Sequence, residues 1–182
     1  MSYSKTVYIG IDPGLSGAIA VITPEAYTVH DMPTLEVVAG RQRSKSTGKM
    51  TDKIRNKYHV AEIKRILLQV RDEAHAKNYP VQVWLEDVHA MPGQGVTSMF
   101  NMGVGFGVLQ TVPQCLEMPL HFVSPVTWKK VVMAGQGKEK DAAVYKAQML
   151  YPNAVLTTPR GRLLDGRAEA LLIAHYGKSL NN

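Results

Sequence analysis

Cysteine is nearly absent from this chain of 182 residues, which contains only Cys115. A single cysteine allows no disulfide within the chain, which fits a reducing compartment, and excludes a zinc site built from several thiolates. Long apolar runs are also absent, because runs such as residues 170–174 are far too short to span a bilayer. Residues 1–10 lack the apolar stretch of a signal peptide. We therefore expect a cytoplasmic protein with no membrane partner.

Acidic residues are scarce relative to basic ones. Lys and Arg number 21 against 15 Asp and Glu, so the net charge is +6 and the isoelectric point is about 9.4. An excess of positive charge in a soluble protein suggests a polyanionic partner, most often nucleic acid. The hydrophobic fraction of 45% is typical of a globular protein. The length suits one compact domain and is too short for two ordinary ones, so we expect a single domain over residues 1–182.

Hydrophobic periodicity predicts an α/β fold. Three consecutive segments rich in β-branched and aromatic residues read as a β-meander, and two later strands follow: 6–12, 17–23, 27–32, 81–86 and 119–123. Helical spacing or composition indicates five helices: 59–77, 96–110, 126–133, 140–150 and 165–176. Three strands in a row, then strands alternating with helices, predict a mixed five-stranded sheet flanked by helices.

A basic insertion near residues 39–58 separates the third strand from the first helix. The insertion contains only one acid, Asp52, and seven cationic residues, which are Arg41, Arg43, Lys45, Lys49, Lys53, Arg55 and Lys57. One interpretation is a solvated mobile loop. The other is a flexible arm that contacts phosphates, and the one-sided charge favours this second interpretation.

Four acids occupy the positions where a catalytic site is expected. Asp12 ends the first strand, Glu86 ends a later apolar strand, and Asp165 and Glu169 share one face of the last helix. Acids at strand ends and at a helix start can converge at the edge of an open sheet. Close carboxylates repel each other unless a cation joins them, and oxygen ligands favour Mg²⁺ or Mn²⁺. Two such ions about 3.5–4 Å apart promote phosphodiester hydrolysis.

Each acid also has a structural interpretation. Asp12 could stabilise the following Pro-Gly turn, Asp165 could cap the last helix, and Glu169 could favour the positive end of that helix. Glu86 is harder to explain in this way, because an acid that completes a buried strand needs a partner. Asp87 points to the opposite face of that strand, so we expect it to be structural.

Four motifs together resemble those of RuvC-type Holliday junction resolvases. They are IGIDPGLSG at 9–17, VWLEDV at 83–88, SPVTWKK at 124–130 followed by GQGKEKD at 135–141, and DGRAEALLIA at 165–174. The resemblance runs from the first strand to the last helix. It implies an RNase H-like fold, a homodimer, and Mg²⁺-dependent nicking of four-way DNA junctions. The DGRAE variant and the basic insertion resemble the phage-encoded branch of the family. This resemblance implies that other branched DNAs are also possible substrates. It also implies that the protein acts in the cytoplasm of a host cell.

The resemblance also implies which residues contact DNA. It places the third region against phosphates through Lys129, Lys130, Lys138 and Lys140, although an exposed basic helix end is an equal alternative. Lys138 could also orient the scissile phosphate. From the insertion we add Arg41, Arg43, Lys45 and Lys49. The glycines of helix 96–110 suggest close packing in the core, while in the family this helix helps to form the dimer.

The leading hypothesis is a structure-selective endonuclease that resolves four-way junctions by paired nicking. In it, Asp12, Glu86, Asp165 and Glu169 hold two Mg²⁺ ions. A broader debranching nuclease for Y-forks and flaps, and a junction-binding protein without catalysis, remain alternatives. An actin-like kinase also begins with Gly-Ile-Asp-x-Gly, but such enzymes need two lobes and about twice this length.

Overall fold

A five-stranded mixed sheet forms the centre of the molecule. The computed structural model describes residues 5–137, 139 and 141–181, so the predicted DNA contacts Lys138 and Lys140 lie outside the described residues. The strand order is β3-β2-β1-β6-β7, in which β1 pairs with β2, and β2 with β3, in antiparallel fashion, while β1 with β6 and β6 with β7 are parallel. The strand bounds are β1 Val7–Asp12, β2 Ala18–Ile22, β3 Tyr27–Asp31, β6 Val81–Glu86 and β7 Leu120–Val123.

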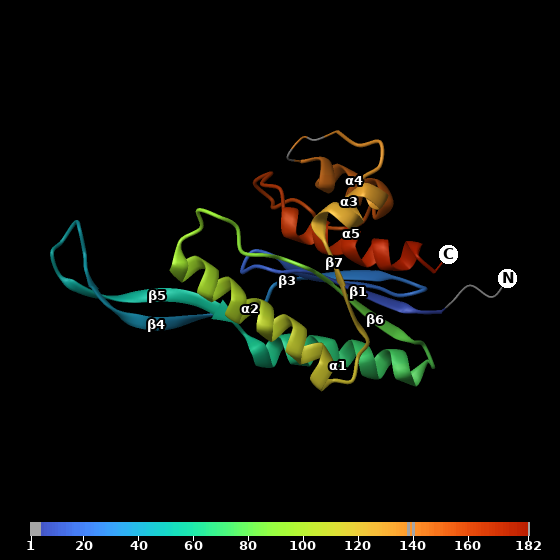
Figure 1. Cartoon of the computed structure of the whole chain (residues 1–182), viewed down its shortest axis with the longest axis horizontal. Coiled ribbons are helices and arrows are strands. Elements are labelled where there is room, and N and C mark those ends of the chain that lie inside the picture. The colour runs from blue at the N-terminus through green and yellow to red at the C-terminus, as the bar shows by residue number, and fades with distance from the viewer. Residues whose placement is uncertain (1–4, 138, 140, 182) are drawn as a thin grey trace.

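Helices cover both faces of this sheet (Figure 1). On one face lie α1 (Val60–Ala76) and α2 (Val96–Cys115). On the other lie α3 (Pro125–Val132), α4 (Ala142–Leu150) and α5 (Asp165–Ser179). The predicted α/β architecture, a mixed five-stranded sheet flanked by helices, is confirmed.

The alternation of side chains along β1 decides which residues reach the site. Ile9 and Ile11 pack into the core beneath α1 and α2, so Tyr8, Gly10 and Asp12 point to the α5 face. A Cβ atom on Gly10 would collide with the backbone oxygen of Ala170 in α5. The missing side chain therefore lets α5 cross directly over β1, which brings the first turn of the helix to the end of the strand.

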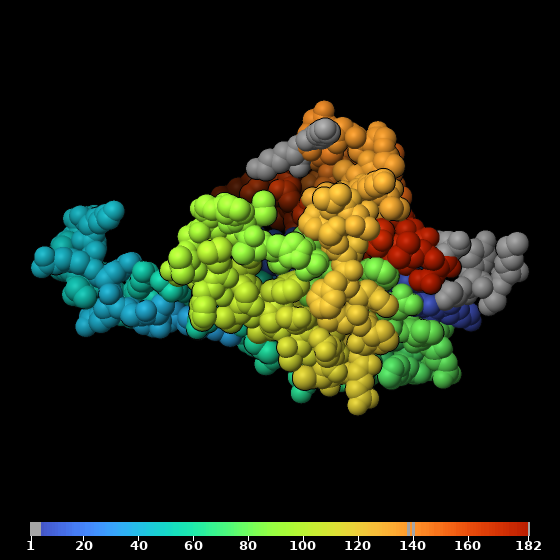
Figure 2. Space-filling model, viewed as in Figure 1, coloured from blue at the N-terminus to red at the C-terminus, as the bar shows by residue number. Residues whose placement is uncertain are grey.

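The basic insertion is folded, contrary to the interpretations as a mobile loop or a flexible arm. It forms an antiparallel two-stranded sheet, β4 (Thr34–Arg43) and β5 (Met50–Tyr58), which we call the ribbon. The ribbon projects from the body of the molecule, as Figures 1 and 2 show. Its strands were missed because they pair only with each other and leave both faces largely exposed. Without a buried face, a strand need not show strict apolar alternation.

Helix α2 differs from its prediction in length and in packing. It continues past residue 110 to Cys115. Of its glycines, Gly105 is buried against the ring of Tyr58, whereas a Cβ atom on Gly103 or Gly107 would meet open space. The prediction of a close-packed glycine face in the core is therefore wrong for Gly103 and Gly107. Among the described residues, no helix combines the length and apolar character needed to cross a membrane.

Candidate active site

Asp12 and Glu86 lie side by side at the carboxyl ends of two parallel strands. The register pairs Ile11 of β1 with Leu85 of β6, so the next residue of each strand is an acid. Glu86 lies two residues after Trp84 on β6, so the two side chains point to the same face of the sheet. Trp84 packs in the core beneath α5, and Glu86 therefore faces α5, as Asp12 does. Asp12 and Glu86 are only 9% and 7% exposed. The sheet thus holds two buried carboxyl groups at one edge.

Glu169 reaches the same place from α5. A Cβ atom built on Gly166, in the first turn of that helix, would lie 3.1 Å from Oδ2 of Asp12. Glu169 is close enough that its charge acts on both strand acids. The structure therefore brings together three of the four predicted acids, from two strands and one helix.

Burial and mutual repulsion make these acids hard to ionise. Burial, followed by the charges of Glu169 and Glu86, raises the pKa of Asp12 to about 8, against an ordinary value of 3.8. Burial is also the main cause of the raised pKa of Glu86, although a hydrogen bond from Trp128 opposes it. A cluster with this tendency binds protons at neutral pH unless another cation enters it.

Helix α3 supplies a neutral and a charged donor to the cluster. Nε1 of Trp128, a fully buried residue, donates to Oε1 of Glu86 at 2.8 Å. Nζ of Lys129 donates to Oε1 of Glu169 at 2.7 Å and lies 5.0 Å from the centre of the Trp128 ring. Ser124 caps the helix by accepting from the backbone N–H of Thr127, which fixes where α3 begins.

Trp128 was missed by sequence reasoning. The available signal was that buried Glu86 needs a partner and that a buried indole N–H needs an acceptor. Lys129 was predicted only as a phosphate contact, whereas it also belongs to the acid cluster. Its role in binding DNA remains a prediction.

Tyr58 at the root of the ribbon supports the turn that follows Asp12. The backbone N–H of Gly14 donates to Oη of Tyr58 at 2.9 Å, so the structural interpretation of Asp12 as the acceptor that stabilises this turn is wrong. Burial raises the pKa of Tyr58, and the charge of Asp12 adds to that rise. Tyr58 lies 46 positions from Asp12, and no local pattern in the sequence links the two residues.

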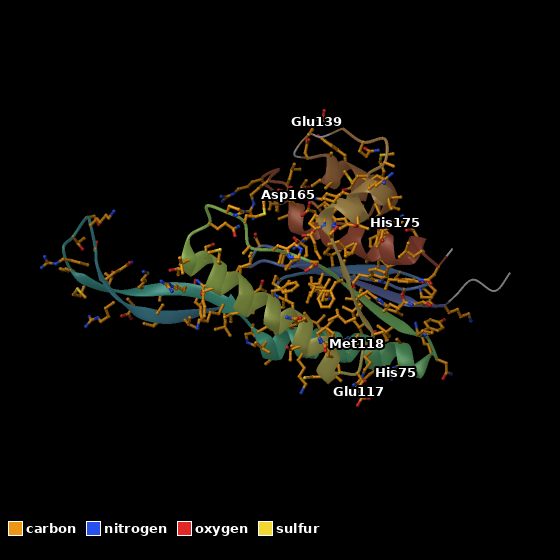
Figure 3. The ribbon with its side chains drawn as sticks, in the orientation of Figure 1. His75, Glu117, Met118, Glu139, Asp165 and His175 are labelled. Carbon is orange, nitrogen blue, oxygen red and sulfur yellow. The ribbon has the colours of Figure 1, made fainter. Side chains whose placement is uncertain are left out.

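Asp165 opens α5 one turn before Glu169 (Figure 3). The interpretation of Asp165 as the helix cap is wrong, because the N-cap residue is Leu164 and its side chain makes no capping hydrogen bond. The interactions that join Asp12, Glu86 and Glu169 do not include Asp165. Its assignment as a fourth ligand remains a prediction.

The donor chemistry of the cluster fits a hard divalent cation, although the side chains are not arranged around one. Two buried carboxyl groups with raised pKa values and a third beside them provide the oxygen ligands that Mg²⁺ and Mn²⁺ prefer. Within the described ranges, no three or more His, Cys, Asp or Glu side chains are positioned to hold a metal ion. Trp128 and Lys129 donate hydrogen bonds to Glu86 and Glu169, respectively, at carboxylate oxygens that such an ion would also contact.

The other predicted DNA contacts that the structure describes lie on the surface. Arg41 and Arg43 belong to the half of β4 far from the body, and Lys45 and Lys49 belong to the turn that joins the ribbon strands. Lys130 is exposed on α3. No member of this group joins the acid cluster, so a direct role in holding metal is not expected for them.

The contribution of Glu169 to catalysis can be tested by substitution, with Glu139 as the control position. Glu139 is an exposed acid on the loop between α3 and α4 (Figure 3). Under the sequence-based hypothesis of a Mg²⁺-dependent nuclease, we expect Glu169→Gln to reduce cleavage of DNA by at least about tenfold, because it removes a charge from the acid cluster. Glu139→Gln should leave activity near that of the parent. Initial cleavage rates in Mg²⁺ provide the measurement, and equal rates for the two variants would exclude Glu169 from the catalytic set.

Comparisons with known proteins identify similar folds. No protein-family model matches the chain, and a search of the curated proteins finds no match either. Among solved structures, Thermus thermophilus RuvC in complex with a Holliday junction substrate is 14% identical, with a TM-score of 0.55. That match covers 94% of this chain and 91% of the other. A second Thermus thermophilus RuvC structure is 16% identical, covers 97% and 98% of the two chains, and has a TM-score of 0.50. The fold is therefore RuvC-like.

Proposed function

We propose that the protein is a Mg²⁺-dependent endonuclease that resolves four-way DNA junctions by paired nicking. The observation that carries this proposal is the convergence of Asp12, Glu86 and Glu169 at one sheet edge of a RuvC-like fold. Together with Asp165, these acids would hold two Mg²⁺ ions, with Mn²⁺ as a substitute. Bound there, the ions would activate a water molecule and stabilise the leaving oxygen of the phosphodiester.

The residues of this chain prepare the site for that chemistry. Burial keeps bulk water away from Asp12 and Glu86, which strengthens every electrostatic interaction at the scissile phosphate. Trp128 fixes the orientation of Glu86 through one oxygen and leaves the other free. Lys129 carries a positive charge beside the cluster and can reach an approaching phosphate, because its side chain is 45% exposed.

A four-way junction is the substrate best supported. One solved structure with the same fold is a complex with a Holliday junction, and the net charge of +6 suits a DNA with several duplex arms. The cleavage rates of the parent protein on four-way junctions, Y-forks, flaps and linear duplex, each with and without Mg²⁺, test this choice. Equal rates on forks and junctions would favour the debranching nuclease, and binding without cleavage would favour the non-catalytic alternative.

An exposed apolar stripe on α2 supports a homodimer. Val96, Phe100 and Val104 recur every four residues and are 79%, 71% and 55% exposed, and Gly103 and Gly107 leave open space beside them. A stripe of this kind suits a second helix packed against it. A symmetric dimer would match the two-fold symmetry of the junction and bring two sites to opposed strands.

We expect the parent protein to be a dimer in solution and Phe100→Glu to be a monomer. A buried charge without a partner opposes association strongly. Met149→Glu is the matched control, because Met149 is exposed to the same extent, 70%, on α4. Sedimentation velocity gives the masses. A parent that is strictly monomeric yet makes paired nicks would contradict the dimer.

A further inference from the structure

The two faces of the ribbon carry different charges. Cross-strand partners share a face, so Glu36 and Asn56, Val38 and Ile54, Arg41 and Asp52, and Arg43 and Met50 belong to one face of the ribbon. This face has two acids and two cations, so it is close to neutral. Arg41 is moreover paired with Asp52 at 3.8 Å.

The opposite face is positive only. Lys57 is paired with Leu35 and Arg55 with Val37, and Lys53 follows with the same parity on β5. The register irregularity between Val38 and Arg41 places its extra residue on β4, so the alternation along β5 is unbroken. None of the paired residues on this face is acidic. We call Lys53, Arg55 and Lys57 the β5 row.

The β5 row begins at the root of the ribbon. Lys57 precedes Tyr58, whose hydroxyl holds the turn after Asp12, and the side chains of Lys57 and Tyr58 point to opposite faces of the ribbon. From this root the ribbon extends away from the body on the side where the carboxyl ends of β1 and β6 lie (Figure 1). A nucleic acid whose phosphate occupies the acid cluster can therefore continue along the ribbon.

We propose that the ribbon is a track for one duplex arm of the substrate, and that the β5 row grips the phosphate backbone of that arm next to the branch point. This inference rests on the proposed function for its substrate. It differs from the sequence interpretation, which assigned the binding to Arg41, Arg43, Lys45 and Lys49. In the folded ribbon, Arg41 lies on the near-neutral face, while Lys45 and Lys49 lie at the far end.

The dimensions of the ribbon fit such a track. Alternate residues of a strand are about 6.7 Å apart, so the β5 row spans about 13 Å, close to the rise of four base pairs. The ten residues of β4 extend about 33 Å, close to the rise of ten base pairs. The row therefore needs only a short arm, whereas the cations at the tip need an arm that reaches the end of the ribbon.

The salt dependence of junction binding tests this arrangement. The row variant changes Lys53, Arg55 and Lys57 to Gln, and the tip variant changes Arg43, Lys45 and Lys49 to Gln. A control variant changes Lys64, Lys77 and Lys178 to Gln, which removes the same charge from α1, its C-cap and α5. Binding is measured without divalent metal on junctions with arms of about 20 and about 8 base pairs, which are roughly 70 and 27 Å long.

We expect the row variant to flatten the slope of log affinity against log salt by about one to three units on both junctions. The tip variant should flatten it by a similar amount only on the long arms, and the control should leave it near the parent value. An unchanged slope for the row variant would overturn the proposal. The proposal would also be overturned if the control variant flattened the salt slope as much as the row variant does. It would be overturned too if the row variant flattened the slope on single-stranded DNA as much as on the junctions.

Cleavage separates a failure of this inference from a failure of the proposed function. At saturating protein and low salt, the row variant should cleave a junction at nearly the parental single-turnover rate, because none of its three residues contacts the acid cluster. Loss of that rate would assign the row to the catalytic site and overturn the track. A parent protein that never cleaves branched DNA would contradict the nuclease, while the salt slopes would still decide where DNA lies on the ribbon.

Discussion

Replacing Asp12 with Asn should reduce cleavage of a four-way junction by several orders of magnitude and leave the fold intact. Asp12 is buried, and burial together with two neighbouring acids raises its pKa to about 8. Without metal, its side chain is mostly neutral at pH 7, and Asn reproduces that neutral side chain in size and polarity. The substitution therefore removes a metal ligand without leaving a cavity.

Binding should separate from catalysis in this variant. Because Asn matches the mostly neutral side chain that Asp12 has without metal, we expect Asp12→Asn to bind the junction at least as tightly as the parent. Asp87→Asn is the matched control, since Asp87 follows the neighbouring strand end but is half-exposed and lies near His89. Single-turnover rates and dissociation constants should be measured for both variants. A substantial nicking rate for Asp12→Asn in Mg²⁺ would remove Asp12 from the mechanism.

A second large effect is expected in the pH dependence of stability. The pKa of Asp12 is about 8 in the folded protein and 3.8 in the reference state. Between these values, the folded state holds a proton that the unfolded state has released, so the free energy of unfolding falls as the pH rises. From about pH 6 to pH 8, this loss is at most about 3 kcal/mol, or roughly 5–10 °C in melting temperature.

Divalent metal should reverse this trend. Ligand carboxylates must be deprotonated, so metal binding and proton release are coupled, and Mg²⁺ should stabilise the protein more at pH 8 than at pH 6. Asp12→Asn should be less sensitive to pH and gain little from Mg²⁺. Thermal melts with EDTA and with Mg²⁺ at both pH values provide the measurement. A parent whose stability in EDTA does not fall relative to that of Asp12→Asn from pH 6 to pH 8 would contradict the raised pKa.

Local patterns in the sequence predicted the central sheet because its strands pack apolar side chains against the helices. Residues 6–12 and 81–86 are apolar almost throughout, and each ends in an acid, so both the strands and their functional ends were visible. The ribbon was not predicted, because its strands derive their register from each other and show no core-facing pattern. Its one-sided charge, in contrast, is visible in the sequence.

The supporting residues of the site depend on contacts between distant segments. Trp128 bonds to Glu86 across 42 positions, and Tyr58 bonds to Gly14 across 44. No spacing rule connects such pairs, because they meet only when α3 and the ribbon root pack against the sheet. The acids can be predicted from the sequence because they lie at strand ends and at helical spacing. The residues that orient them can be identified only in the structure.

The most direct test of the proposed function is to map the nicks that the parent protein makes on an immobile four-way junction labelled separately on each strand. We predict Mg²⁺-dependent nicks at symmetric positions on two opposed strands, with 5′-phosphate and 3′-hydroxyl ends and no cleavage in EDTA. Binding of the junction with no cleavage of any strand in Mg²⁺ or Mn²⁺ would contradict the account.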